Sequence, residues 1–153
     1  MYKKYPEIML TDKSGKREYG ARQLIDITQP AFLFFAERII KNIVTCSSSF
    51  SNVIGYQLDN ETKHFNTSSK NVYISFEKYL KDKYGDNLEK LNYDYGLDYW
   101  SNRINSWEDF PPINSTINGS LGAAFEKFQR LIVTKYLNWQ STIVEKYKKR
   151  VNL

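Results

Sequence analysis

The stretch VIGYQLDNE, residues 53–61, decides how the rest of the chain is interpreted. Its first six residues, Val53 to Leu58, are mostly apolar and include the residue types that favour β-structure, which is typical of a strand buried in a sheet. A predicted helix and a short loop precede this strand, and that order of elements is characteristic of a parallel α/β fold. The sequence therefore predicts a strand that leads directly into an aspartate, an amide and a carboxylate.

Helices are predicted on both sides of this strand. Thr28 is expected to cap the first of them, and Pro30 suits its first turn. The apolar face expected for that helix comprises Phe32, Phe35, Ala36, Ile39, Ile40 and Ile43. The remaining predicted elements are a turn at residues 12–16, a helix over about 72–84, a short helix at 87–93 and a long helix over about 120–149.

Composition limits the chain to one ordinary core. With 153 residues, of which 41% are hydrophobic, a single domain or a piece of a larger one is expected. No run approaches the roughly 18 apolar residues of a membrane span, and the start of the chain does not have the character of a signal peptide, so a cytoplasmic location is expected. The single cysteine, Cys46, has no disulfide partner in the chain and is expected to be a small buried apolar residue.

The charge pattern argues against a nucleic-acid partner. The formal net charge is +5, but positive residues gather near the two ends and acidic residues are mixed through the middle. A nucleic-acid footprint would need the positive charges on one surface. We therefore expect neither a nucleic-acid nor a membrane partner, although a basic helical interaction module without catalytic function is the alternative of a different class.

The residues that follow the predicted strand suggest a site. In parallel α/β folds the carboxyl ends of the strands carry the chemistry, and Glu61 lies three residues after the last apolar strand position. Burial or a second carboxylate would let Glu61 act as a general acid, and the neutral amide of Asn60 would bond a sugar hydroxyl. Taken without further support, these residues are better explained as the polar start of a loop than as a site. The only histidine, His64, is expected to be exposed to solvent.

Four segments in one order resemble the catalytic domain of glycoside hydrolase family 42, the β-galactosidases built on a TIM barrel. Residues 4–22 (KYPEIMLTDKSGKREYGAR) are similar to the family's loop after the third barrel strand, and residues 53–61 are similar to the fourth strand with its Asn-Glu pair. Residues 76–112 resemble the segment that follows. Residues 128–149 (FQRLIVTKYLNWQSTIVEKYKK) resemble the helix that leads to the fifth strand.

The resemblance implies a role for four residues. Glu61 would be the general acid/base of a retaining double displacement, and Asn60 would bond the 2-hydroxyl of the sugar. Arg22, in YGAR, matches a family arginine that holds the glycone, and Trp100, in LDYWSNR, matches a tryptophan of the sugar-binding wall. Both residue types suit these tasks, since an aromatic face packs on a sugar ring and arginine supplies several donors. Read without the resemblance, Arg22 would be a surface cation and Trp100 a core aromatic.

Two family features are absent from the sequence. Many members hold a structural zinc with a cysteine cluster, but this chain has Asp26 at the upstream position and no cysteine after the Asn-Glu pair, so no zinc and no other cofactor is expected. A retaining mechanism also needs a second carboxylate roughly 5–5.5 Å from the acid. In the family this nucleophile comes from a strand far downstream, so it is expected to lie outside this chain.

These observations predict an α/β fragment of a (β/α)₈ barrel, covering about the third to fourth β/α units with a long insertion. Residues 1–153 would form one piece of the catalytic barrel, helix-rich in isolation, with no complete second domain. The full-length enzyme would be a β-galactosidase acting on β-galactosides or related small saccharides, and a homo-oligomer, a trimer by family resemblance. The segment alone is expected to be inactive. Within the enzyme class, an α-L-arabinopyranosidase is the alternative.

Overall fold

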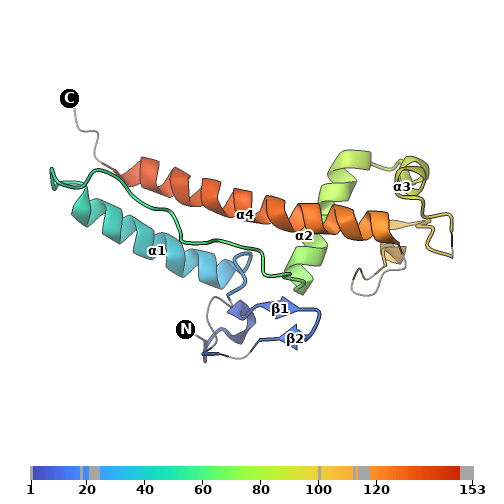
Figure 1. Ribbon diagram of the computed structural model, residues 1–153, viewed down its shortest axis with the longest axis horizontal. Coiled ribbons are helices and arrows are strands. Elements are labelled where there is room, and N and C mark those ends of the chain that lie inside the picture. The colour runs from blue at the N-terminus through green and yellow to red at the C-terminus, as the bar shows by residue number, and fades with distance from the viewer. Residues whose placement is uncertain are drawn as a thin grey trace.

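Two long helices, α1 and α4, lie side by side and organise the fold (Figure 1). The computed structural model describes residues 2–17, 19–20, 25–99, 101–111, 113 and 118–148. Helix α1 spans Pro30–Ser47 and α4 spans Gly119–Tyr147. The ring of Phe32 lies 6.2 Å from that of Tyr136, and the Lys41 ammonium lies 5.1 Å from the ring of Tyr147. Because both contacts advance together along the two helices, α1 and α4 run in the same direction.

The predicted strand at residues 53–58 is extended but forms no strand, so that prediction is wrong for this chain. The backbone N–H and C=O groups of residues 54–58 make no hydrogen bond to another described residue. The short strands β1, Thr11–Asp12, and β2, Gly15–Lys16, pair with each other and not with this segment. A strand exists only with a neighbour to complete its ladder, and the described part of the chain provides none.

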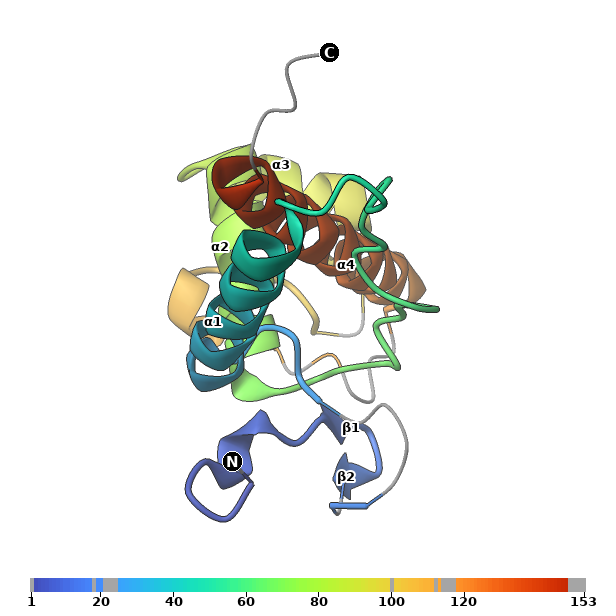
Figure 2. The ribbon, with the colours of Figure 1, turned by 90° about the vertical axis from the view of Figure 1, so that its left-hand side faces the viewer.

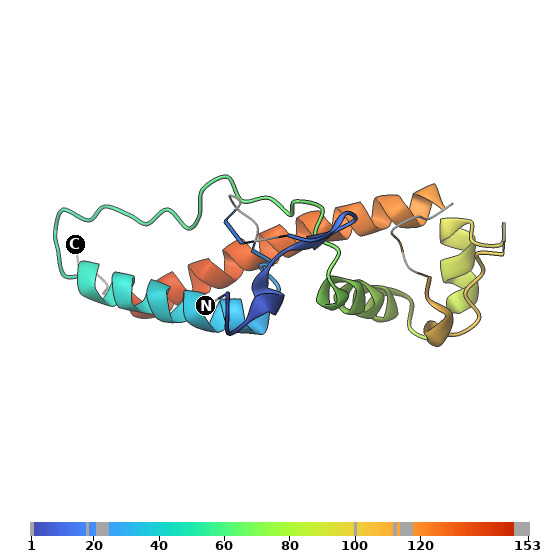
Figure 3. The same ribbon diagram turned by 90° about the horizontal axis from the view of Figure 1, so that it is seen from below.

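The extended segment 53–58 nevertheless lies on one face of the helix pair and runs opposite to both helices (Figure 2 and Figure 3). The Tyr56 hydroxyl is 2.8 Å from the Ser47 hydroxyl at the end of α1. Tyr56 and Leu58 are half-buried. Gly55, which precedes Tyr56, and Gln57, which lies between the two, are exposed. This alternation is the period of a strand with one face on a helix layer.

The core lies at the other end of the molecule, among α2, Lys70–Tyr84, α3, Leu88–Tyr95, and the first half of α4. The short helix η2, Trp107–Asp109, packs against this core, whereas η1, Pro6–Ile8, precedes the β1–β2 hairpin. The buried members of this core are Val72, Phe76, Leu80, Tyr84, Leu91, Leu97, Ile104, Ile113, Leu121, Phe125, Phe128 and Ile132. Helices α2 and α3, the segment after them and the first half of α4 therefore carry most of the packing.

Helix α1 is poorly covered by comparison. Val44 is its only buried residue among those described. Ile39 and Ile43, which were expected on the buried face, are 53% and 56% exposed, and Phe34 is 66% exposed. Cys46 is also exposed, contrary to the expectation of a buried apolar cysteine. The apolar side chains of α1 are thus only partly covered by the residues that the structure describes.

The start of α1 differs from the prediction in its cap. Pro30 is the first helical residue, as predicted, but Gln29 is the N-cap and makes no side-chain capping bond. The Thr28 hydroxyl instead donates to the buried Asp26 carboxylate over 2.6 Å, and the Thr28 N–H donates to the same oxygen over 2.9 Å. These two hydrogen bonds to the charged Asp26 carboxylate fix the turn that leads into the helix.

The other predicted helices are confirmed, and their ends follow from local chemistry. The Asn87 side chain accepts from the Lys90 N–H at the start of α3, and Gly96, with φ of +61°, ends that helix in the left-handed conformation that glycine adopts at no cost. The Asn118 side chain accepts from the Leu121 N–H at the start of α4. Within the residues that the structure describes, no helix combines the length and apolar character needed to cross a bilayer.

Replacing Asn92 by alanine is expected to lower the free energy of unfolding by about 1–3 kcal/mol. Asn92 is fully buried, and its amide both donates to the Ile104 C=O over 2.8 Å and accepts from the Ile104 N–H over 2.9 Å. The variant leaves both backbone groups unpaired inside the core. Urea denaturation measures the change. Asn102→Ala, which removes an exposed amide bonded to the Tyr99 C=O, is the control and should change little.

Candidate active site

The loop at residues 59–62, which follows the extended segment, carries the candidate catalytic residues. Asp59 organises this loop: one carboxylate oxygen accepts from the Asn60 N–H over 2.7 Å, and the other accepts from the Thr62 hydroxyl over 2.6 Å. The Gln57 side-chain amide donates to the Asp59 C=O over 3.0 Å and to the Asn60 side-chain oxygen over 3.3 Å. Side chains of residues 57–62 thus hold the turn in which Glu61 is presented.

Glu61 has a left-handed backbone, with φ of +53°. Phe65 and Asn66, further along the same loop, are also left-handed, with φ of +46° and +56°. Such conformations are uncommon in residues other than glycine, and they gather where a site needs a defined backbone geometry. The loop therefore presents the side chain of Glu61 in a direction that ordinary extended chain would not give.

Asn60 and Glu61 both line a cavity of about 170 Å³ between this loop and the helix pair. Phe32 of α1 and Tyr136 of α4 form part of its wall, together with Ile25 and Ile27. Both candidate residues are exposed to solvent. The structure thus brings the two predicted residues together at one opening. General-acid catalysis also needs burial or a second carboxylate, and in this chain the Glu61 side chain stays exposed.

Tyr136 and Asp59 are parts of this site that the sequence reasoning missed. Burial and, to a smaller extent, the negative charge of Asp59 raise the pKa of Tyr136 to about 12. Tyr136 is therefore a neutral hydroxyl donor at physiological pH. Its position on the apolar side of a predicted helix indicated only packing. Asp59 could have been found, since an aspartate followed three residues later by threonine is typical of a side-chain-bonded turn.

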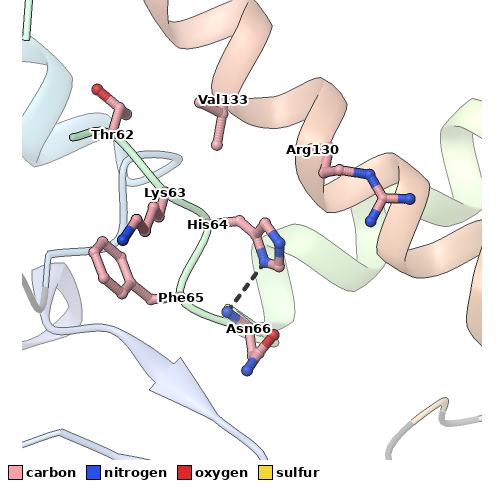
Figure 4. A pocket seen from close by; sticks show the side chains of 7 residues that line it. All are labelled: Thr62, Lys63, His64, Phe65, Asn66, Arg130 and Val133. Atoms are coloured by element: carbon pink, nitrogen blue, oxygen red, sulfur yellow. Dashed lines mark hydrogen bonds between the residues drawn. The ribbon is translucent and has the colours of Figure 1, made fainter.

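His64 lies beside a second cavity of about 430 Å³, between the loop and α4 (Figure 4). His64 is partly buried, whereas the sequence predicted a side chain exposed to solvent. Its Nδ1 atom accepts from the Asn66 N–H over 3.1 Å, which leaves Nε2 to carry the proton of the neutral ring. Arg130 and Val133 of α4 line the same cavity.

The pKa of His64 is expected below its ordinary value of 6.5, and NMR titration of the ring measures it. Burial lowers this pKa most, the positive charge of Arg130 lowers it further, and Glu126 opposes them. Arg130→Gln should raise the midpoint and Glu126→Gln should lower it. Because the folded state holds the proton less tightly than the unfolded state, His64 reduces stability as the pH falls below about 6.5. Equal midpoints in the three proteins would contradict the assigned causes.

The two other predicted site residues, Arg22 and Trp100, lie outside the described residues. Among the residues that are described, no three histidine, cysteine, aspartate or glutamate side chains gather as a metal-binding group. Asp26 accepts three hydrogen bonds, from the Thr28 N–H, the Thr28 hydroxyl and the Gln29 side-chain amide.

Comparison with known proteins identifies relatives along nearly the whole chain. The BgaA β-galactosidase of Clostridium cellulovorans is 26% identical over 150 residues, which is 95% of this chain and 23% of that protein. The YesZ β-galactosidase of Bacillus licheniformis is 27% identical over 149 residues, which is 94% of this chain and 22% of that protein. The chain thus spans less than a quarter of the length of these curated relatives.

The solved structures that resemble this chain also match nearly all of it, and it again corresponds to less than a quarter of each of them. The β-galactosidase of the psychrophilic Marinomonas ef1 superposes with a TM-score of 0.85 at 21% identity, over 96% of this chain and 23% of that chain. The β-galactosidase of Bacillus circulans sp. alkalophilus superposes with a TM-score of 0.86 at 20% identity, over 97% of this chain and 23% of that chain. At these identities the likeness concerns the fold alone: this helix-rich chain superposes on part of solved β-galactosidases, which are TIM-barrel proteins.

The family model for glycoside hydrolase family 42, described as β-galactosidase, matches residues 1–153. This match covers the extended segment, the loop with Asn60 and Glu61, and both long helices. The chain therefore belongs to glycoside hydrolase family 42.

Proposed function

We propose that this chain contributes the acid/base half of a retaining β-galactosidase site, and that hydrolysis is carried out by a full-length enzyme of which it is a segment. The observation that carries this proposal is the family match over the whole chain together with the position of Glu61. Glu61 follows an extended segment that lies on a helix layer, and it lines a cavity beside Asn60. In this proposal Glu61 lies at the carboxyl end of a barrel strand, where barrel enzymes place their chemistry.

In this proposal residues 1–153 correspond to about the third and fourth β/α units of the barrel, with a long insertion in the fourth unit. The core that α2 and α3 form with the first half of α4 supports the view that the insertion is a structural unit packed against the rest of the chain. The extended segment 53–58 then corresponds to the fourth barrel strand. Its alternation of half-buried and exposed residues is what a strand between helices and barrel interior requires.

The chemistry assigns Glu61 two steps. Its protonated carboxyl gives a proton to the glycosidic oxygen as the carbon–oxygen bond breaks, while a carboxylate from the rest of the enzyme attacks the anomeric carbon. The Glu61 carboxylate then takes a proton from the water that releases the sugar. Asn60 bonds the 2-hydroxyl of the sugar, and the Gln57 amide bonded to its side-chain oxygen orients it. Arg22 and Trp100 are proposed to hold the glycone.

The purified 153-residue chain is expected to release no detectable product from a chromogenic β-galactoside, whereas a full-length enzyme that contains it should hydrolyse the substrate. The nucleophile is proposed to lie outside the chain, and without it the covalent glycosyl-enzyme intermediate cannot form. Parallel assays with a chromogenic α-L-arabinopyranoside identify the preferred glycone. Hydrolysis by the isolated chain that Glu61→Gln abolishes would overturn the proposed division of the site between two parts of the enzyme.

A further inference from the structure

A third cavity, of about 600 Å³, lies between the β1–β2 hairpin, the loop at residues 66–68 and the start of α4. It is larger than the cavity beside Glu61 and shares no lining residue with it. Its volume falls within the range of about 300–1,000 Å³ that small-molecule sites occupy. We propose that this hairpin cavity is a second ligand site, separate from the Glu61 cavity, which binds a neutral saccharide.

Two hydrogen bonds hold the three walls of the hairpin cavity together. The Ser68 N–H donates to the Thr11 C=O over 2.7 Å, which joins the loop to the hairpin. The Gln129 side-chain amide donates to the Thr67 C=O over 2.6 Å, which joins the same loop to α4. Asn66, further back on this loop, also lines the cavity (Figure 4). The cavity is therefore formed by the fold itself, as is usual for small-molecule sites.

Gln129 brings a buried polar atom without a partner to this cavity. The side chain is only 5% exposed, and its Nε2 atom is used in the bond to the Thr67 C=O. Its Oε1 atom accepts no hydrogen bond from a described residue, although the side chain lines the cavity. Burying an acceptor in this way costs free energy unless a donor reaches it. A hydroxyl group of a bound molecule would supply that donor.

The charged side chains of the cavity balance one another, which favours a neutral ligand. Lys13 and Arg17 bring positive charge to its lining, and Asp12 and Glu126 bring negative charge. Arg17 is ion-paired with Asp12, and Arg130 is ion-paired with Glu126 over 2.5 Å. A phosphate or carboxylate would meet two carboxylates there. Hydroxyl groups, in contrast, both donate and accept, so they can bond the charged groups of either sign.

The remaining walls suit the shape of a sugar. The side chains of Ile113 and Phe125 give the cavity apolar surface. Gly119 and Gly122, on the first turn of α4, also line it, and a Cβ atom added to either would meet no atom within 4 Å. The N–H of Gly119, the first helical residue, has no acceptor within the helix. A saccharide, with an apolar C–H face and a rim of hydroxyl groups, matches both kinds of wall.

The test is an NMR titration of the ¹⁵N-labelled 153-residue chain with lactose as the neutral saccharide. We expect saturable shifts of the Gly119 and Gly122 amide signals, because both residues line the hairpin cavity. Inorganic phosphate, titrated in parallel, should leave these two signals unchanged. The amide signals of Asn60 and Glu61 report on the candidate active site in the same spectra, so the two sites are followed independently.

Two variants of α4 locate the binding site. Gly122→Leu places a side chain in the open space of the cavity, so it should raise the Kd for lactose at least about tenfold. Because leucine favours a helix more than glycine does, this variant should keep the circular dichroism spectrum of the wild type. Ala123→Leu, at the next and exposed position of the same helix, is the matched control and should bind lactose like the wild type.

Three results would overturn this inference. The first is a wild-type chain whose Gly119 and Gly122 signals show no saturable shift with lactose. The second is an equal Kd for lactose in the wild type and in Gly122→Leu. The third is tighter binding of phosphate than of lactose at these two residues, which would make the site an anion site. Lactose shifts confined to Asn60 and Glu61 give the first of these results and still agree with the proposed function.

Discussion

Replacing Glu61 by glutamine in a full-length family 42 enzyme that contains residues 1–153 should reduce kcat/KM for lactose by about 10²–10⁴-fold, the usual contribution of a general acid/base. Glutamine keeps the shape and the hydrogen-bonding reach of the side chain but can neither give a proton to the glycosidic oxygen nor take one from water. The neighbouring bonds from Asp59 to the Asn60 N–H and the Thr62 hydroxyl do not involve the Glu61 carboxylate, so the loop is retained.

The choice of substrate turns this loss into a test of the assigned role. A dinitrophenyl galactoside has a leaving group that departs without a proton, so its first step should be much less affected than that of lactose. The limb of the pH–rate profile that reports the acid should disappear in the variant. Glu145→Gln, at an exposed carboxylate paired with Lys148 on α4, is the control and should retain the wild-type rate. Equal losses for both substrates would indicate binding or structure instead of proton transfer.

How far the sequence predicts the fold depends on whether an element is stabilised locally. Helices α2, α3 and α4 were predicted because their spacing of apolar residues lies within each segment itself. The strand at residues 53–58 was predicted from the same kind of pattern, but a strand also needs a neighbour, and the residues that the structure describes supply none. The exposed Ile39 and Ile43 of α1 have the same cause, since an apolar face predicts burial only if a partner is present.

The sequence predicted the two central residues of the candidate site, but not the other residues that line its cavity. Adjacent Asn60 and Glu61 follow an apolar segment in the sequence, and the structure places both at one cavity. Tyr136 reaches that cavity from a position 75 residues beyond Glu61, and no local pattern distinguishes it from an ordinary packing residue. The prediction that Thr28 caps α1 was wrong: Gln29 is the N-cap, and the Thr28 hydroxyl donates to the Asp26 carboxylate two residues before it. Arg22 and Trp100 stay predictions, because they lie outside the described residues.

Replacing Phe76 by alanine should lower the free energy of unfolding by about 3–5 kcal/mol, the usual cost of removing a buried phenylalanine. Phe76 is completely buried on α2. Its ring lies 5.2 Å from that of Phe125 and 5.3 Å from that of Phe128 on α4, and 6.0 Å from that of Phe110. The substitution therefore removes apolar burial and opens a cavity where three segments meet, in the part of the chain that carries most of the packing.

Urea denaturation followed by tryptophan fluorescence measures this loss, because Trp107 stacks on Phe110, which in turn contacts Phe76. Ile74→Ala, two residues earlier on the same helix but 53% exposed, is the matched control and should shift stability by no more than about 0.5 kcal/mol. The isolated chain draws its stability mainly from this core, since α1 buries so little. A Phe76 variant that unfolds at the wild-type urea concentration would show that the core around α2 does not hold the chain together.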